Sequence, residues 1–216
     1  MDDTVEINDR NLEIIADNIA GTAQVMCSHD GCGVVVSYHE SISHQIACPH
    51  GRCTCMEPGC DFAAPPSALV IHLAEAHSIQ VHRIEYGMPK EFRVTMTRPG
   101  SPFRHIVIQG EDGSVFVLNI GVHGSATVVS LVRVSVRTSA WPLYRVKMWA
   151  RGPPPSLKAD CKRDVVRMVA YASSSASPGA VPVEELTSFL VVPRPYLVGA
   201  GSSKQLRLYI HICKHM

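Results

Sequence analysis

The chain has 216 residues, of which 46% are hydrophobic and 18% charged, and this is the composition of a globular protein. No apolar run approaches the roughly 18 residues that a membrane-spanning helix requires, so we expect a soluble protein. The formal net charge of +1 at pH 7 gives the whole molecule no general attraction to nucleic acid or membranes.

The first 26 residues contain neither Cys nor His. Leu12, Ile15 and Ile19 recur at helical spacing before Gly21, which predicts a short amphipathic helix. The start, "MDDTVEINDR", lacks the basic patch and apolar stretch of a secretory signal. We therefore expect a reducing cytoplasmic or nuclear compartment, in which the cysteines remain thiols or thiolates and do not form disulfides.

Residues 27–77 hold six of the eight cysteines and six of the eleven histidines. Their spacing repeats, because a shift of 28 residues superimposes Cys27 on Cys55, Cys32 on Cys60 and His44 on His72. Each unit offers four candidate metal ligands. They are Cys27, Cys32, His44 and Cys48 in the first unit, and Cys55, Cys60, His72 and His77 in the second unit.

Thiolate sulfur and imidazole nitrogen in sets of four are the ligands of tetrahedral structural zinc. Four protein ligands leave no coordination position for water or substrate, so we expect two structural Zn²⁺ ions and no catalysis at either. Scattered core cysteines or disulfides are the alternative, but two matched frames in a chain without a secretory signal argue against it. Three cysteines fit neither frame and are interpreted as bystander thiols: Cys53, Cys161 and Cys213.

Each unit is expected to end in a helix that carries its last two ligands. In "SYHE", Ser37 and Glu40 form a capping-box pattern, so His44 and Cys48 lie on one helix face. In the second unit "PPSALVIHLAEAH" predicts a helix from about Ser67, whose last turn must tighten or fray to bring both histidines to one ion.

The composition of the two units argues against DNA binding. Residues 27–77 contain one basic residue, Arg52, and five acidic ones, which is the reverse of what phosphate contacts require. The second helix presents Ala68, Leu69, Val70, Ile71 and Leu73 where a DNA-reading helix would carry Arg, Lys, Asn or Gln. We expect these apolar residues to pack against another domain.

After about residue 90 the sequence becomes a series of short runs rich in Val, Ile, Phe and Tyr, separated by turn-forming pieces such as "GEDG" and "GAGSS". This pattern predicts an antiparallel β-sandwich, with the serine-rich stretch 173–178 as a surface loop. No nucleophile with a base, phosphate-binding loop or paired carboxylates is recognisable, so we predict no catalytic residues. The whole chain is then α+β, mainly β.

One part of the sandwich region has a local charge bias. Between Asp112 and Asp160 no acidic residue occurs, whereas six residues are basic: Arg133, Arg137, Arg145, Lys147, Arg151 and Lys158. An acidic partner fits this stretch, and so does a solvated strand face on which alternate residues are basic.

With this ligand frame, the acidic units and the trailing strands, the chain resembles the seven-in-absentia (SINA or SIAH-type) ubiquitin ligase family, in particular its plant branch. The closest stretches are "SYHESISHQIACPHGRCTCMEPGCDF" with "HLAEAH", and more loosely "SFLVVPRPYLVGAGSSKQLRLYIHI". The resemblance implies a linking helix over residues 1–24, a double SIAH-type zinc finger over 25–80 and a TRAF-like substrate-binding sandwich over 88–214. It also places the eight candidate ligands on the family's zinc positions.

Two features depart from the family. Four residues separate Cys27 from Cys32 where the family usually has six, which shortens a loop without removing a ligand. The N-terminal RING of the family, which recruits the ubiquitin-conjugating enzyme, has no counterpart here, so we expect no autonomous ligase activity.

The resemblance implies an adaptor or dominant-negative regulator in the ubiquitin pathway, which dimerises with itself or with RING-bearing relatives and binds protein substrates along a sandwich edge. Our candidate for that edge is Thr127–Val136, with Val129 and Leu131 as test positions. The alternatives are an active ligase component and a nucleic-acid-binding zinc-finger protein. Membranes are not expected as partners, and nucleic acid is not favoured.

Overall fold

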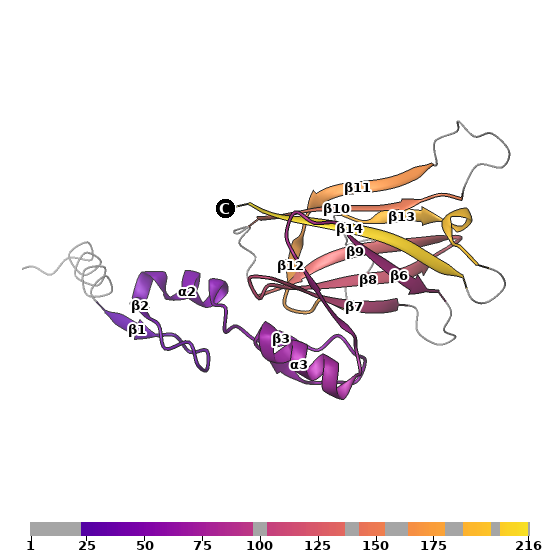
Figure 1. The fold of residues 1–216 in the computed structure, drawn as a ribbon. Helices are drawn as coiled ribbons and strands as arrows, with labels where there is room; N and C mark the ends of the chain where they lie inside the picture. Colours follow the sequence, from indigo (N-terminus) through magenta and orange to yellow (C-terminus); the bar gives the residue numbers. More distant parts are fainter. Residues whose placement is uncertain are drawn as a thin grey trace, which may run out of the picture.

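The computed structural model describes residues 23–96, 103–136, 143–153, 164–179, 188–199 and 204–215. They form two small helix-containing units followed by a sandwich of two β-sheets (Figure 1). The amphipathic helix expected around residues 12–19 lies outside the described residues. None of the described helices has the length and apolar character that crossing a bilayer demands.

The two units have the same order of elements. In the first unit, the strands β1 (Gln24–Met26) and β2 (Val35–Ser37) pair antiparallel and lead into helix α2 (Tyr38–Ala47). In the second unit, β3 (Cys53–Thr54) and β4 (Ala63–Ala64) pair in the same way before α3 (Pro66–Ala76). The 28-residue repeat of the ligands is therefore a repeat of the whole local fold.

Both helices begin close to the predicted positions. Ser37 is the N-cap of α2, but its Oγ donates to the Glu40 carboxylate at 2.8 Å and makes no cap hydrogen bond to a helix N–H, so the two side chains of the predicted capping box bond to each other instead. Helix α3 begins with Pro66, a residue suited to the first turn because it has no N–H to leave unpaired. His77 is the C-cap residue of α3, with φ −114° and ψ 0°, and this departure from helical geometry accommodates its five-residue spacing from His72.

One sheet of the sandwich has four strands in the order β11-β10-β14-β6. Its strands are β6 (Lys90–Thr95), β10 (Leu143–Arg151), β11 (Val165–Tyr171) and β14 (Gln205–His215). All of its neighbouring strands are antiparallel. Strand β6 forms one edge of this sheet.

The other sheet has six strands in the order β12-β9-β8-β7-β5, with β13 also paired to β9. Its strands are β5 (Val81–Ile84), β7 (Phe103–Gly110), β8 (Val115–His123), β9 (Ala126–Val134), β12 (Ser173–Ser175) and β13 (Leu190–Pro193). A short 3₁₀-helix, η2 (Arg194–Tyr196), follows β13. Strand β5 precedes residue 88, where the sequence predicted the sandwich to begin.

The sandwich is mainly antiparallel, as predicted, but two pairs are parallel: β5 with β7 and β12 with β9. Both short strands enter from outside the sheet, β5 from the second unit and β12 directly after β11 of the opposite sheet. The prediction of a loop at residues 173–178 is wrong for Ser173–Ser175, which pair with Val132–Val134. Serine lacks the apolar alternation that marks a strand, so this edge strand gave no signal in the sequence.

The core lies between the two sheets and is built from alternate residues of each strand. Its largest fully buried side chains include Phe116, Leu118, Tyr144, Met148 and Leu208. The rings of Phe116 and Tyr144 meet edge to face at a centroid distance of 5.0 Å across the two sheets.

Strand β9 belongs to this core, which corrects the prediction that Thr127–Val136 offers an edge to a peptide. It pairs with β8 on one side and with β12 and β13 on the other. Val129 is 0% exposed and Leu131 is 5% exposed. The continuous apolar run of β9 is the signature of an interior strand, buried on both sides, and not of an edge.

The turn at "GEDG" anchors one end of the sandwich through Asp112. Its carboxylate accepts hydrogen bonds from Tyr86 Oη at 2.5 Å, Tyr144 Oη at 2.8 Å and Lys214 Nζ at 2.6 Å. Burial alone raises the pKa of Asp112, but these hydrogen bonds and that from the Ser114 N–H outweigh it and hold the pKa well below its usual range. One carboxylate thus joins residues of both sheets.

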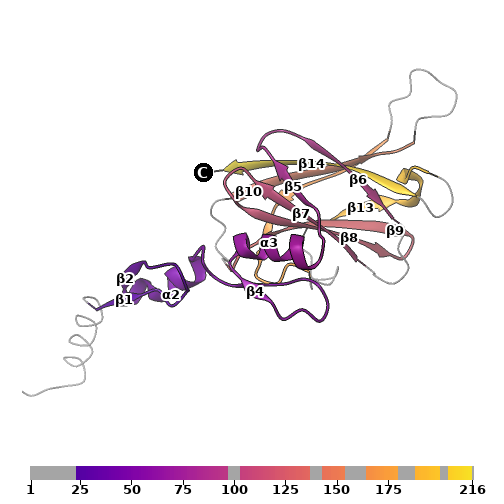
Figure 2. The same cartoon turned by 60° about the horizontal axis from the view of Figure 1, so that its bottom comes forward.

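The second unit packs on the outer face of the six-stranded sheet. Leu69, Val70 and Leu73 of α3 share a buried cluster with Cys53 and with Val107, Val115, Val117 and Val134 of the sheet. Figure 2 shows α3 against β7 and β8, whereas the first unit extends away from the sandwich. The prediction that apolar residues of the second helix pack against another domain is confirmed for Leu69, Val70 and Leu73, and it is wrong for Ile71, which is 57% exposed.

Candidate metal centres

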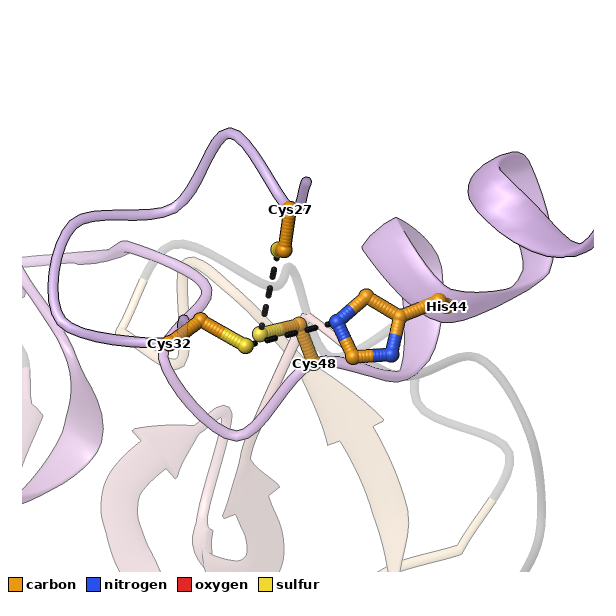
Figure 3. A group of neighbouring side chains, drawn as sticks. All are labelled: Cys27, Cys32, His44 and Cys48. Carbon is orange, nitrogen blue, oxygen red and sulfur yellow. Dashed lines mark hydrogen bonds between the residues drawn. The ribbon is translucent and has the colours of Figure 1, made fainter. Parts of the chain in front are cut away.

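The structure brings all eight predicted ligands together in two groups. Within each group the candidate ligand atoms lie within 4.8 Å of one another. In the first, Cys27 Sγ is 3.8 Å from Cys48 Sγ and Cys32 Sγ is 3.4 Å from His44 Nε2. Figure 3 shows these four side chains converging, with Cys27 and Cys32 from the β1–β2 loop and His44 and Cys48 from α2 and its C-cap.

The second group has the same arrangement with two histidines. Cys55 Sγ lies 3.4 Å from His77 Nε2, and Cys60 Sγ lies 3.3 Å from His72 Nε2. The two imidazole nitrogens are 3.1 Å apart. Phe62 stacks on the His72 ring at a centroid distance of 3.9 Å with an angle of 12° between the planes, which fixes the orientation of this ligand.

These distances fit the edges of a zinc coordination tetrahedron. With Zn–S bonds of about 2.3 Å and Zn–N bonds of about 2.0 Å, ligand atoms are separated by about 3.8 Å for S to S, about 3.6 Å for S to N and about 3.3 Å for N to N. The separations in both groups are close to these values. The donor sets, three Cys with one His and two Cys with two His, are those of structural zinc.

The backbone around the first cysteine pair of each group repeats in detail. Cys27 N–H donates to Val34 O, and Cys55 N–H donates to Phe62 O, both at 2.8 Å. The second cysteines, Cys32 and Cys60, donate to the carbonyls three residues earlier, at 3.1 and 3.2 Å. The preceding glycines, Gly31 and Gly59, both have φ of +79°, a left-handed conformation that glycine adopts without steric cost. The turn that brings two thiols onto one ion therefore requires glycine at this position.

The protein environment of the thiols differs within one site. A hydrogen bond from the Val34 N–H lowers the pKa of Cys32 to about 7, against the opposing effect of burial. Burial raises the pKa of Cys48 to about 11, and burial also raises the pKa of Cys55. A buried thiol resists ionisation unless a cation is present, so a Zn²⁺ ion held at these sites would supply the charge that favours the thiolates of Cys48 and Cys55.

His29, which from the sequence alone is most simply interpreted as a surface residue, lies at the first site. The Cys27 sulfur is 3.4 Å from His29 Nδ1 and 3.5 Å from the His29 backbone nitrogen. In the tautomer protonated at Nδ1, both groups of His29 donate to the Cys27 thiolate, and such outer hydrogen bonds orient and stabilise a ligand. Its position two residues after a ligand cysteine was the available sequence signal.

The cysteines that belong to neither site differ in how deeply they are buried. Cys53 is fully buried in the cluster under α3, and burial raises its pKa to about 11, so it acts as a small apolar residue. Cys213 lies half-buried on β14 with its sulfur 3.6 Å from His211 Nε2. Cys161 lies outside the described residues.

No family model matches the chain, and no curated protein matches it. The two centres are therefore assigned from their donor sets, distances and backbone repeat. On those grounds they are two Cys/His clusters suited to zinc.

The serine-rich stretch, to which the sequence analysis gave no function, joins the second centre to the sandwich. Thr54, beside the ligand Cys55, donates its N–H to Ala176 O at 2.8 Å, and its Oγ1 lies 2.7 Å from Ser177 Oγ. A Cβ at Gly179 would stand 2.3 Å from Met56 Cβ, so glycine allows the close approach. Residues more than a hundred positions apart thus meet, which local sequence patterns do not reveal.

A groove of about 660 Å³ lies next to the second centre. Met56 and His77 of the second unit contribute to one part of its lining, and Arg93 of β6, Arg104 of β7 and Val122 of β8 to others. Buried side chains of the sandwich core, among them Phe92 and Ile120, also line it. The groove is mixed in character and runs beside β6, the edge strand of the four-stranded sheet.

Proposed function

We propose that the protein is a zinc-binding, SINA-like adaptor that binds protein substrates or RING-bearing relatives in the ubiquitin pathway. The observation that carries this proposal is the pair of matched Cys/His clusters, the second of which is built into a β-sandwich. Four protein ligands at each site leave zinc no open position for a substrate or water. The ions then act structurally, and binding takes place elsewhere on the chain.

The groove beside β6 is our candidate for the protein-binding site, in place of β9. An extended peptide added to β6 forms main-chain hydrogen bonds with the strand edge, while its alternate side chains enter the groove. Phe92 and Ile120 favour apolar side chains there. The second unit forms part of the groove wall, so folding around zinc would also shape the binding site.

The role in the ubiquitin pathway is tested by titrating the zinc-loaded protein into a reconstituted ubiquitination reaction. The reaction contains a RING-bearing SINA relative and one of its substrates. We expect inhibition if the chain displaces a RING-bearing subunit and stimulation if it presents substrate. No effect, together with no mixed dimer in analytical ultracentrifugation, contradicts the proposal.

The binding site is tested with two exposed valines. Val122 is 65% exposed and lines the groove, whereas Val191 is 45% exposed on β13 and does not line it. We expect Val122→Asp to weaken capture of the RING-bearing relative or its substrate about tenfold and Val191→Asp to have no effect. Equal effects of the two variants, with both folded, would exclude the groove.

The same reaction also tests an active ligase component. Ubiquitin transfer by the isolated chain, in the absence of any RING-bearing protein, would replace the adaptor proposal with that alternative.

A further inference from the structure

The outer face of the four-stranded sheet differs from that of the six-stranded sheet. The outer face of the six-stranded sheet is apolar where the second unit covers it. On the four-stranded sheet, the outward residues of β10 and β11 are exposed or half-buried, and four of them are cationic: Arg145, Lys147, Arg151 and Arg167. We call this surface the basic sheet face.

Six cationic side chains lie on the basic sheet face, and all six are exposed. They are Arg93 of β6, Arg145, Lys147 and Arg151 of β10, Arg167 of β11 and Arg207 of β14. Within the described residues of this face, the acidic side chain is Glu91, which pairs with Arg93 at 2.9 Å. Glu91 also attracts Arg207, and the other four cations have no carboxylate beside them on the described face, where the sequence alone indicated only a basic bias.

Some of these cations are direct cross-strand neighbours. Arg207 is paired with Arg93 in the register of β14 and β6, and Arg145 and Lys147 lie two residues apart on β10. Like charges placed opposite each other in a sheet lower its stability. Such a surface attracts an extended polyanion, because the bound anion relieves the repulsion.

Aromatic rings stand among these cations. Trp149 and Tyr209 are cross-strand partners whose rings stack at a centroid distance of 5.4 Å, with 11° between their planes. Lys147 Nζ lies 5.4 Å from the Trp149 ring, and the Arg151 guanidinium lies 5.1 Å from the Tyr209 ring. Tyr171, 53% exposed on the edge strand β11, adds a third ring.

An acidic peptide would use the cations of this face but has no need of the rings. A single-stranded nucleic acid uses both, because phosphates pair with Lys and Arg while unpaired bases stack on aromatic rings and guanidinium planes. Several RNA-binding modules bind single-stranded nucleic acid on an open β-sheet that carries aromatic residues among cations.

We propose that the basic sheet face binds single-stranded nucleic acid, with its phosphates held by the six cations and its bases stacked near Trp149, Tyr209 and Tyr171. This activity goes beyond the protein binding proposed above. The basic sheet face shares only Glu91 and Arg93 with the lining of the groove, so the two sites can be altered separately. It also differs from the acidic Cys/His units, which are poor candidates for phosphate contacts.

The charge contribution is tested by fluorescence anisotropy with labelled 12-nucleotide oligouridylate and oligothymidylate and the zinc-loaded full chain. The face variant is Arg145→Gln with Arg207→Gln, and the control is Arg83→Gln with Arg194→Gln, two exposed arginines outside the face. We expect the face variant to bind at least tenfold more weakly and the control to stay within twofold of the unaltered protein. For the face variant, the magnitude of the slope of log affinity against log salt concentration should fall by about 1.4. Each of the two lost phosphate contacts accounts for about 0.7 of this change.

The stacking contribution is tested at Trp149. We expect Trp149→Leu to weaken binding about tenfold and Trp149→Phe, which keeps a ring, to restore most of the affinity. Thermal unfolding of both variants checks that the sheet is intact.

Several outcomes would overturn the proposal. These are no binding of either oligonucleotide at 50 mM salt, an equal loss in the control double variant, or tighter binding of a duplex of the same length. A 12-residue oligoglutamate that competes as well as the oligonucleotides, together with unchanged affinity in Trp149→Leu, would identify an acidic protein as the partner. A preference for oligouridylate over oligothymidylate, or the reverse, distinguishes RNA from DNA within the proposal.

Discussion

The two Cys/His units share a ligand frame and a backbone fold, but among the described residues only those of the second unit share a buried apolar cluster with the sandwich. The difference lies in their helices. Leu69, Val70 and Leu73 of α3 are buried, and the equivalent positions of α2, 28 residues earlier, are Ser41, Ile42 and Gln45. Ile42, the one apolar residue among them, is 69% exposed. The ligands therefore determine the local fold of a unit, and the helix face determines whether it docks.

The largest effect is expected when equivalent zinc ligands are substituted, Cys32 in the first unit and Cys60 in the second. We expect Cys32→Ser and Cys60→Ser each to lose one of two bound zinc ions. Cys60→Ser should also uncover Val107, Val115 and Val117 and lower the free energy of unfolding of the sandwich by on the order of 5 kcal/mol. Cys32→Ser should leave it unchanged. Zinc analysis measures the first effect, and urea unfolding followed by tryptophan fluorescence measures the second.

Chelation of both ions extends the same test. A sandwich independent of zinc would survive chelation unchanged while residues 27–77 disorder. Because the second unit shares a buried cluster with the sheet, we instead expect chelation to lower sandwich stability as Cys60→Ser does. Equal unfolding midpoints with and without chelator would show that the apolar contact contributes little.

A smaller effect comes from the docking helix itself. Leu73 is fully buried, and Leu73→Ala is expected to lower the free energy of unfolding by about 3 kcal/mol, through lost burial and a residual cavity. The equivalent change in the first unit, Gln45→Ala, affects an exposed side chain and should be neutral. Both variants should still bind two zinc ions, so urea unfolding separates docking from metal binding. A zinc loss in Leu73→Ala would mean that docking and coordination are one event.

A substitution of Asp112 tests whether the hydrogen bonds at this end of the sandwich contribute to stability independently of the second unit. Asp112→Asn should cost about 2 kcal/mol at pH 7, since a carboxylate that accepts several hydrogen bonds becomes a neutral amide. The folded pKa of Asp112 is depressed, so its contribution is complete above the unfolded pKa near 4 and is lost as pH falls through the lower folded value. The stability difference between the two proteins should therefore shrink below about pH 4.

The partners of Asp112 lie in the β5–β6 connection, β10 and β14, and not in α3. We therefore expect the cost of Asp112→Asn to be the same in the Cys60→Ser background. Glu111→Gln, in the same turn, is the matched control and should be neutral at every pH.

The local parts of this structure were accessible from the sequence. The ligand spacing, Gly31 and Gly59, and the apolar α3 are short-range signals, and the structure has the two groups and the docked helix that they predict. The prediction that β9 is a peptide-binding edge was wrong. The position of a strand within a sheet depends on pairing between distant segments, which local sequence patterns do not show. The basic bias of β10 was visible, but its meeting with Trp149, Tyr209 and Arg207 on one face depends on the register of β10 with β14.

The contact between Thr54 and the serine-rich stretch was also hidden from the sequence, and it gives the smallest test of the comparison. Thr54→Val removes the hydroxyl that lies 2.7 Å from Ser177 Oγ and should cost about 0.5 kcal/mol, since the pair is exposed. Thr54→Ser keeps the hydroxyl and is the matched control. In a double-mutant cycle with Ser177→Ala we expect a coupling free energy of similar size, because each single change already breaks the same bond. Additive costs would mean that the two hydroxyls do not interact, and the hydroxyl of Thr54 would then contribute through its 3.3 Å bond to Ala176 O.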